Sequence, residues 1–195
     1  MAERKAISRI AERKLRDREA RRVRIITAAK EIAEREGWAN VTVRRLAEEI
    51  AYSQPVLYTH FENREAILAA VAIEGFKELG KVLEKARLGA KRESALEPVA
   101  VAYLEFAASS PALYEVMFSV GLNVPFGDSA TPSELRFGFS QLSKLFEGRT
   151  SNPEIHAELF WAELHGVAEL TRTKRLPRKY QKERMRALVK LFASR

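Results

Sequence analysis

The chain has 195 residues, of which 46% are hydrophobic and 31% are charged, a composition that suits a packed core under a water-soluble surface. It contains no cysteine, which excludes disulfides and thiolate metal sites, and no apolar run long enough to span a membrane. Its first residues, MAERKAISRIAERKLRDREARR, are charged and lack the apolar core of a signal peptide. We therefore expect a cytoplasmic protein.

The net charge of +8 is distributed unevenly. Residues 1–24 hold 10 Lys and Arg against 4 Asp and Glu, and residues 172–195 hold 10 against 1, whereas residues 66–171 hold 9 against 14. A basic segment favours nucleic acid, because each phosphate that it neutralises releases a counterion. For either end taken alone, a solvated charged surface is an equally good explanation.

Apolar residues recur at helical spacing along almost the whole chain. The first helix is expected over about 18–36, with Gly37 ending it. Thr42 is placed to cap a second helix over 43–50. It would cap that helix alone, because a capping box needs an acid or an amide where Arg45 stands.

A third short helix is expected over 54–60, with Ser53 as its cap and Pro55 in its first turn, where a missing N–H costs nothing. Asn63 is placed to cap a long fourth helix. Beyond a charged break, helical spacing and the prolines predict five more helices, over about 94–108, 111–120, 132–147, 153–171 and 178–193, with a Gly- and Pro-rich loop over 121–132. The sequence thus predicts an all-α fold of about nine helices and no sheet.

The second and third helices, joined by a three-residue turn, have the dimensions of a helix-turn-helix. In that unit the first helix braces against the DNA backbone and the second lies in the major groove. Leu57 and Phe61 are expected to face inward, and a short buried helix in an ordinary bundle is the alternative. The side chains left to face outward are Gln54, Pro55, Val56, Tyr58, Thr59 and His60.

These outward side chains have chemistry that suits DNA. Glutamine can pair with N6 and N7 of adenine, and proline or valine can contact a thymine methyl group. Tyr58 and His60 suit phosphates, which fix register without reading sequence. Arg64, beside the start of the fourth helix, would add a charge-assisted phosphate contact.

The stretch 41–68 resembles the N-terminal domain of the tetracycline-repressor (TetR) family of bacterial regulators. That pattern has a threonine opening the second helix, a Leu-Ala pair inside it, and an L-Y-x-H-F run followed by a basic residue; the matching residues are Thr42, Leu46, Ala47, Leu57, Tyr58, His60, Phe61 and Arg64. The resemblance implies a homodimer in which each third helix enters one half-site of a double-stranded DNA operator. By position it implies base contacts from Arg44, Gln54 and Pro55, and phosphate contacts from Thr42, Tyr58, His60 and Arg64.

One position departs from the family pattern. The turn usually has glycine where this chain has Ala51. A left-handed backbone there would cost alanine roughly 1 kcal/mol relative to glycine. Either the turn is reshaped or the strain is tolerated.

We divide the chain into a basic arm over 1–17, a helix-turn-helix DNA-binding domain over 18–66 and an effector-binding and dimerisation domain over 67–195. The arm either follows the minor groove or backbone of DNA or is a disordered solubilising tail. The resemblance places the last helices far from the operator. We therefore expect the basic stretch 172–195 to be solvated surface.

Residues 70–195 show no reactive cluster. His156 and His165 lie nine residues apart, roughly 900° around a helix and so on opposite sides of it. Glu163 beside His165 completes no triad or metal set. We therefore expect no catalysis, no metal and no cofactor.

The penultimate helix is apolar nearly all the way round and needs partners on two sides, and the last helix carries one apolar stripe. Since the final two helices usually dimerise in the TetR family, we expect a four-helix interface made by Phe160, Leu164, Met185, Leu188, Val189 and Phe192. The run W-x-x-L-H-G over 161–166 also resembles a motif of one TetR subgroup. Gly166 is expected to permit close helix approach.

An effector pocket is expected among the helices between the two ends. The candidate lining consists of aromatic residues and one methionine, with His165 as a possible polar contact. The residues are Tyr103, Phe106, Tyr114, Met117, Phe118, Phe137, Phe139, Trp161 and His165. Plain core packing is the alternative for each. An aromatic-rich, acidic middle favours an apolar or cationic ligand.

The sequence therefore predicts a dimeric, ligand-responsive repressor that binds a palindromic operator and is released by a small-molecule effector. Such a switch works only if the ligand prefers the released state. A ligand-independent DNA-binding adaptor of the same fold, acting through a protein partner, is the alternative, and a filled core instead of a cavity would favour it. A small-molecule enzyme would need a reactive cluster that the sequence does not show.

Overall fold

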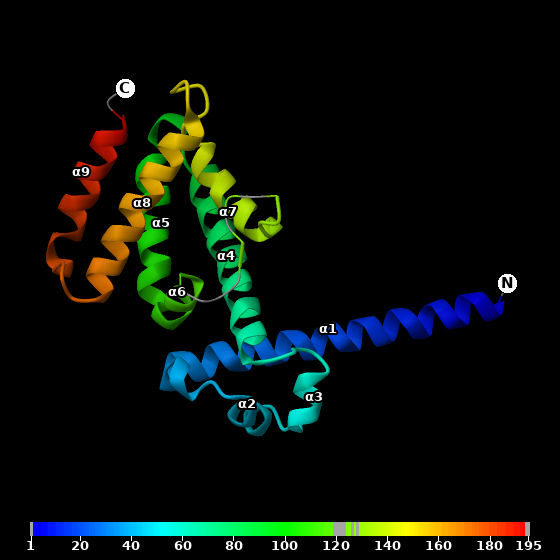
Figure 1. The fold of residues 1–195 in the computed structure, drawn as a ribbon. Helices are drawn as coiled ribbons and strands as arrows, with labels where there is room; N and C mark the ends of the chain where they lie inside the picture. The colour runs from blue at the N-terminus through cyan, green and yellow to red at the C-terminus, as the bar shows by residue number, and fades with distance from the viewer. Residues whose placement is uncertain (1, 119–123, 126, 128, 194–195) are drawn as a thin grey trace. The chain divides into compact units, whose positions relative to one another are not determined.

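The computed structural model describes residues 2–118, 124–125, 127 and 129–193. Within these residues it contains nine α-helices, three short 3-10 turns and no strand (Figure 1), which confirms the all-α prediction. The helices are α1 (Ala2–Glu36), α2 (Val43–Glu49), α3 (Gln54–Tyr58), α4 (Arg64–Leu88), α5 (Leu96–Ser109), α6 (Pro111–Met117), α7 (Ser133–Ser143), α8 (Pro153–Arg172) and α9 (Gln181–Ala193). The described part of the loop over 121–132 is not helical, and the rest of that loop lies outside the described residues.

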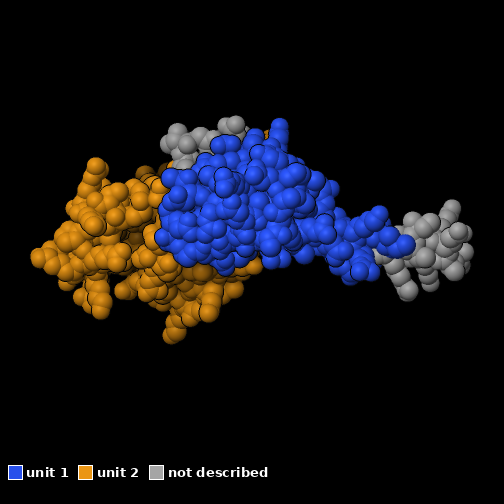
Figure 2. All heavy atoms as spheres, turned by 90° about the horizontal axis from the view of Figure 1, so that it is seen from below, with its two compact units in different colours: residues 1–71, 119–122 blue, residues 72–118, 123–195 orange. Residues whose placement is uncertain are grey.

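The chain divides into two compact units (Figure 2). Unit 1 comprises residues 1–71 and 119–122, and unit 2 comprises residues 72–118 and 123–195. The division falls inside α4, slightly beyond the boundary that we drew after residue 66. None of the described helices is both long and apolar enough to cross a membrane.

The first helix begins earlier than the sequence analysis predicted. Residues 2–17, which we expected as an arm, are the first part of α1. Residues 2–36 contain neither glycine nor proline and are rich in Ala, Glu, Lys and Arg, so nothing interrupts the helix and its composition favours it.

Unit 1 is a three-helix head completed by the start of α4. The α2 and α3 helices pack on each other, and α1 packs on α2. As predicted, Leu57 and Phe61 are buried, together with Ile25, Ile32, Leu46 and Ile67. The inward side of α3 is thus fixed by apolar burial.

The ends of these helices follow the capping predictions with one exception. The hydroxyl Oγ1 of Thr42 accepts from the backbone N–H of Arg45 at 3.1 Å, and Oδ1 of Asn63 accepts from Ala66 at 2.8 Å. Ser53 occupies the N-cap position of α3, but its side chain makes no capping bond.

The turn between α2 and α3 is not reshaped. Ala51 has a φ of 55°, and the N–H of Tyr52 donates to the carbonyl of Ala47 at 2.9 Å while that of Ala51 reaches Glu48 at 3.4 Å. This is a Schellman ending, which normally has glycine at the left-handed position. Alanine therefore holds the strained conformation that the family pattern assigns to glycine.

Ion pairs hold α2 against α1. Arg45 contacts Glu36 at 3.0 Å and Glu49 at 2.6 Å, and Arg35 contacts Glu49 at 3.0 Å. Hydrogen bonds from Arg45 lower the pKa of both carboxyls, that of Glu49 with a further bond from Arg35. The network fixes the brace helix of the helix-turn-helix, although its exposed groups are screened by solvent.

In unit 2, α5 packs against α8 and α9, and α7 packs against α8. The α4 and α7 helices approach each other closely at two glycines. A Cβ built on Gly80 would lie 2.7 Å from the ring of Phe137 and 3.2 Å from Cα of Gly138. Only glycine at position 80 allows this approach.

Candidate nucleic-acid interface and ligand cavity

The outer side of α3 carries most of the side chains predicted to meet DNA. Gln54 and Pro55 are exposed, Val56 is half-buried, and Tyr58 is 54% exposed. A short exposed helix that presents an amide, a proline ring and a phenol behind a brace helix has the geometry of major-groove recognition.

The end of α3 is held against α1 by Arg22. Its Nη1 donates to the carbonyl of His60 at 3.4 Å, and its guanidinium lies 4.3 Å from the centre of the Phe61 ring. The recognition helix therefore has a fixed attachment at its C-terminal end.

Thr59 and His60 differ from what the sequence suggested. The hydroxyl of Thr59 donates to the carbonyl of Val56 at 2.7 Å. Its proton is therefore already used, so Thr59, which we predicted to face DNA, has no hydroxyl proton left to donate to a phosphate. His60 is half-buried, and burial together with Arg18, Arg21 and Arg22 lowers its pKa. Both effects favour the neutral imidazole, which can still donate one N–H.

The two arginines of the predicted set have different roles in the structure. Arg44 is exposed and pairs with Glu48 at 3.0 Å one helical turn away, a surface pair that holds the side chain only weakly. Arg64, in contrast, donates Nε to the carbonyl of Val41 at 2.6 Å and Nη2 to that of Trp38 at 2.7 Å. The predicted phosphate contact at Arg64 is thus corrected to an internal tie, because two carbonyls of the connection before α2 lie within its reach.

The predicted dimer contacts fill the core of unit 2 instead. Phe160 and Leu164 are fully buried, and Met185 and Leu188 nearly so, while Val189 and Phe192 are half-buried and the Phe192 ring packs 5.1 Å from that of Phe160. The sequence analysis recognised that α8 is apolar on more than one side and that α9 has one apolar stripe, but it assigned to the dimer interface residues that pack inside unit 2. The outward apolar residues of α8 are Ile155, Leu159, Ala162, Gly166 and Leu170.

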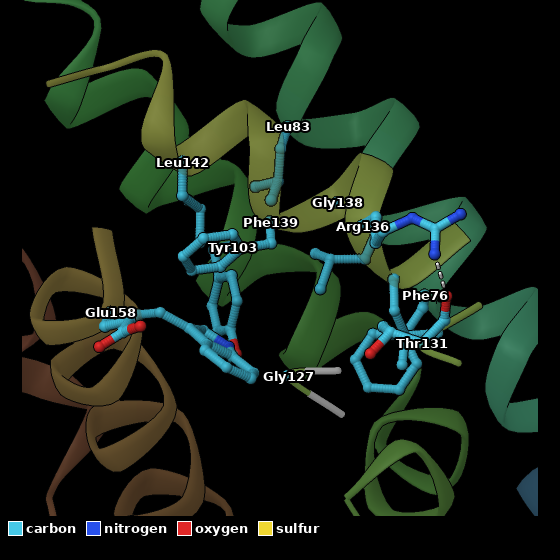
Figure 3. A pocket seen from close by; sticks show the side chains of 13 residues that line it. Phe76, Leu83, Tyr103, Gly127, Thr131, Arg136, Gly138, Phe139, Leu142 and Glu158 are labelled. Carbon is cyan, nitrogen blue, oxygen red and sulfur yellow. Dashed lines mark hydrogen bonds between the residues drawn. The ribbon is translucent and has the colours of Figure 1, made fainter. Parts of the chain in front are cut away.

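Unit 2 contains a cavity of about 460 Å³ (Figure 3). Its lining is mostly aromatic and aliphatic and comes from α4, α5, α7, α8 and the segment before α7: Phe76, Leu79, Leu83, Tyr103, Gly127, Thr131, Leu135, Arg136, Gly138, Phe139, Leu142, Glu158 and Trp161. Figure 3 shows Arg136 and Glu158 on opposite sides of this lining, with Arg136 bonded to the carbonyl of Thr131 at 2.6 Å. A pocket of this size and character is typical of small-molecule sites.

Three of the nine side chains predicted to line an effector pocket lie at this cavity. Tyr103, Phe139 and Trp161 line the cavity. The other predicted side chains pack nearby: Phe137 lies against Gly80, Met117 against Gly75, Phe118 against the rings of Tyr114 and His165, and Phe106 is buried. The leucines that complete the lining belong to ordinary helical stripes, so no signal in the sequence separates them from core.

A chain of hydrogen bonds leads from the cavity wall into the core. Trp161 Nε1 donates to the Tyr103 hydroxyl at 3.1 Å, the two tyrosine hydroxyls lie 2.9 Å apart, and the Tyr114 hydroxyl lies 2.8 Å from Nδ1 of His165. Burial raises the pKa of Tyr103 to about 12 and raises that of Tyr114 as well, and burial lowers the pKa of His165. With His165 neutral and its proton on Nε2, Nδ1 accepts and the bonds run in one direction: Trp161 to Tyr103 to Tyr114 to His165.

Histidine and acidic residues do not gather into a metal site. Among the described residues, no group of three or more such side chains could hold a metal ion. His156 lies apart from His165, with its Nδ1 2.9 Å from the carbonyl of Asn152.

This geometry defines a helix-turn-helix DNA-binding protein with a separate helical unit. Residues 25–71 match the model of the bacterial regulatory proteins of the tetR family, and residues 96–192 match that of the tetracyclin repressor-like C-terminal domain. The chain therefore belongs to the TetR family of transcriptional regulators. The assignment to the W-x-x-L-H-G subgroup stays a prediction.

Relatives of this chain are transcriptional regulators by name. It is 34% identical to the uncharacterized HTH-type regulator YobS of Bacillus subtilis over 47% of this chain and 48% of that one. It is 28% identical to the uncharacterized HTH-type regulator Rv0681 of Mycobacterium tuberculosis over 76% of this chain and 69% of that one. The match thus spans about half of the length of YobS, and both names agree with the prediction of a regulator rather than an enzyme.

Solved structures share the fold. A protein of unknown function from Rhodococcus sp. RHA1 superposes with a TM-score of 0.75 at 23% identity, covering 89% of this chain and 93% of that one. BioQ bound to its double-stranded DNA operator superposes with a TM-score of 0.64 at 20% identity, covering 89% of this chain and 98% of that one.

Proposed function

We propose that this protein is a ligand-responsive repressor that acts in the cytoplasm. It binds a palindromic operator as a homodimer and leaves it when a small molecule occupies the cavity of unit 2. The cavity is the observation that supports a response to a small-molecule ligand, because an adaptor that works only through a protein partner has no need of an apolar cavity of about 460 Å³.

The operator is read by α3. Gln54 and Pro55 are exposed and face the bases, Gln54 with the geometry for adenine and Pro55 for a thymine methyl group. Tyr58 and the half-buried His60 donate to phosphates, and Thr42 retains its own hydroxyl proton while accepting from Arg45. Arg44 contacts a base after giving up its weak pair with Glu48.

The ligand acts through α4. Phe76, Leu79 and Leu83 of this helix line the cavity, and the first residue of the same helix, Arg64, is bonded to the carbonyls of Trp38 and Val41 in unit 1. A molecule that fits the cavity better in one position of α4 shifts the population toward that position. That position is the one that releases the operator.

The ligand is an apolar molecule. Leucines and aromatic rings dominate the lining, and the polar atoms of Tyr103 and Trp161 are already bonded to each other. Arg136 and Glu158 offset each other in charge, so the cavity as a whole selects neither an anion nor a cation.

The dimer forms through the outer side of α8. Ile155 is 53% exposed and Leu159 is 56% exposed, and Gly166 has no atom within 4 Å of the place that a Cβ would take. These residues lie one or two turns apart on the same side of the helix. A second copy of the helix can therefore pack closely along this side, as the family relationship favours.

The test is selection of bound fragments from the source genome, followed by titration of the best fragment. We expect a palindrome, bound tightly by the wild type and at least tenfold less tightly by Gln54→Ala, since a bidentate base contact contributes about 1–3 kcal/mol. Gln181→Ala, a glutamine at the start of α9, is the matched control and should bind as the wild type does. Weak binding without sequence preference in the wild type would overturn the proposal.

A further inference from the structure

Unit 1 has a shallow hollow beside the C-terminal end of the recognition helix. Its volume is about 490 Å³, and it is lined by Lys14, Asp17, Arg18, Arg21, Thr59 and His60. The first four residues belong to α1, and the last two directly follow α3. The hollow therefore joins the projecting part of the first helix to the recognition helix.

Three cations of α1 share the side of the helix that faces this hollow. Lys14, Arg18 and Arg21 are spaced four and three residues apart, which places them along roughly 10 Å of one helix side. Within the described part of the chain, none of the three makes an ion pair, while Asp17 lies 4.0 Å from Arg13. The hollow thus has three cations and one carboxylate in its lining, and that carboxylate lies next to Arg13.

The hollow is held in shape by Arg22. Its bond to the carbonyl of His60 and its stacking on Phe61 tie the end of α3 to α1. The part of α1 that carries the cations and the end of the recognition helix are therefore held next to each other, although the three cationic side chains themselves are exposed.

The imidazole in the hollow responds to this positive charge. The pKa of His60 is lowered first by burial and then by Arg18, Arg21 and Arg22. An anion seated in the hollow would offset the repulsion from these three arginines.

We propose that the hollow seats backbone phosphate of the same duplex that α3 reads, held by Lys14, Arg18 and Arg21. This inference rests on the proposed DNA-binding function and adds to it a contact outside the helix-turn-helix. The three cations lie in α1 before residues 25–71, which match the family model, so the contact lies outside the matched segment. It strengthens binding to every sequence, because phosphates carry no base information.

The test measures the dependence of DNA affinity on salt for Lys14→Gln/Arg18→Gln/Arg21→Gln. Each phosphate contact contributes about 0.9 to the slope of log K against log salt, so the triple variant should lower that slope by about 2 or more. It should do so equally on the selected operator and on an unrelated duplex. The matched control, Lys182→Gln/Arg186→Gln/Lys190→Gln, removes the same charge from exposed positions of α9 and should leave the slope unchanged.

Operators with a single uncharged methylphosphonate locate the contact. One or two positions should weaken binding of the wild type and have no effect on the triple variant. An unchanged slope in the triple variant, or a loss confined to the operator, would overturn the inference.

The two proposals fail in different ways. If the wild type selects no operator but the triple variant still lowers the slope of log K against log salt on any duplex, the phosphate contact is supported and the proposal of a sequence-specific repressor is wrong. If an operator is selected and the slope is unchanged, only the phosphate contact is lost. If the wild type binds no duplex at all, both are wrong.

Discussion

The hydroxyl of Tyr114 lies 2.8 Å from Nδ1 of His165, and this pair ends the hydrogen-bond chain that starts at the cavity wall. Protonation of His165 would turn Nδ1 into a donor and reverse the bond. Tyr114 would then donate to Tyr103, which already accepts from Trp161. The proton of Tyr103 would lose its acceptor in a buried site.

This arrangement predicts that acid weakens unit 2 through His165. Burial lowers the pKa of His165 from its ordinary 6.5, so the unfolded chain takes up the proton first, and stability falls as the pH drops through 6.5 toward the folded pKa. His165→Asn places Oδ1 about where Nδ1 stands and cannot titrate. Its free energy of unfolding, measured by urea titration between about pH 7.5 and 5, should fall less than that of the wild type. Parallel curves for the two proteins would contradict the prediction.

Arg64 should act on stability rather than directly on DNA. Arg64→Ala removes both donors from the carbonyls of Val41 and Trp38, and we expect a loss of roughly 1–3 kcal/mol in the free energy of unfolding. Arg44→Ala, which breaks only a surface pair, should stay within about 0.5 kcal/mol. If Arg64→Ala keeps full stability and loses affinity for DNA, the internal tie is not its main role.

The turn before α3 should gain stability from glycine. Ala51 has a φ of 55°, and Lys174, which ends α8 in the same Schellman pattern, has a φ of 61°. Ala51→Gly and Lys174→Gly should each raise the free energy of unfolding by roughly 1 kcal/mol, because glycine adopts this conformation without strain. Chemical denaturation of the two single variants checks this, and destabilisation by either would show that the strain is absent.

The two glycines between α4 and α7 should differ in tolerance. Gly80→Ala would place its methyl group 2.7 Å from the Phe137 ring and 3.2 Å from Gly138, whereas at Gly138 the nearest atom is a carbonyl oxygen 3.7 Å away. We expect Gly80→Ala to lose about 1–3 kcal/mol of stability through overpacking, whereas Gly138→Ala should gain up to about 1 kcal/mol, because alanine suits a helical position better than glycine and its methyl group would meet only ordinary contacts. Equal midpoints of thermal unfolding for the two variants would contradict this prediction, because they would mean that α4 and α7 can move apart without loss of stability.

The outer side of α8 should control the oligomeric state. Leu159→Glu and Gly166→Leu should each convert a dimer into monomers in analytical ultracentrifugation, the first by burying a charge and the second by blocking helix approach. Leu88→Glu, at an exposed leucine that ends α4, is the control and should remain dimeric. A dimer unaffected by both α8 variants would place the interface elsewhere.

The sequence was most informative where local rules act. The caps at Thr42 and Asn63 and the inward Leu57 and Phe61 follow from side-chain chemistry within a few residues, and the structure has all of them. At Ala51 the sequence left a reshaped turn and a strained one both open, and the structure has the strained one. The start of α1 was missed because a basic segment was taken as an arm, although its residues favour a helix.

Partners that are distant in the sequence were the main source of error. Arg64 carries a charge that suits phosphate, but its carbonyl partners stand more than twenty positions earlier. The α8 and α9 residues assigned to the dimer are apolar at helical spacing, and that spacing does not tell which side meets α5 and which a partner. The cavity likewise depends on leucines that any core helix would carry.

The bonds that Tyr103 and Trp161 already make have a consequence for finding the proposed effector. Both of their donors are in use, so a compound that presents an acceptor to this wall gains no hydrogen bond unless it breaks one that already exists. The affinity of a compound should therefore depend more on how well its apolar part fills the space between α4 and α8 than on matched polar groups. A screening library ranked by rigid apolar volume, with its more hydroxylated analogues as negative controls, is the natural choice for this protein.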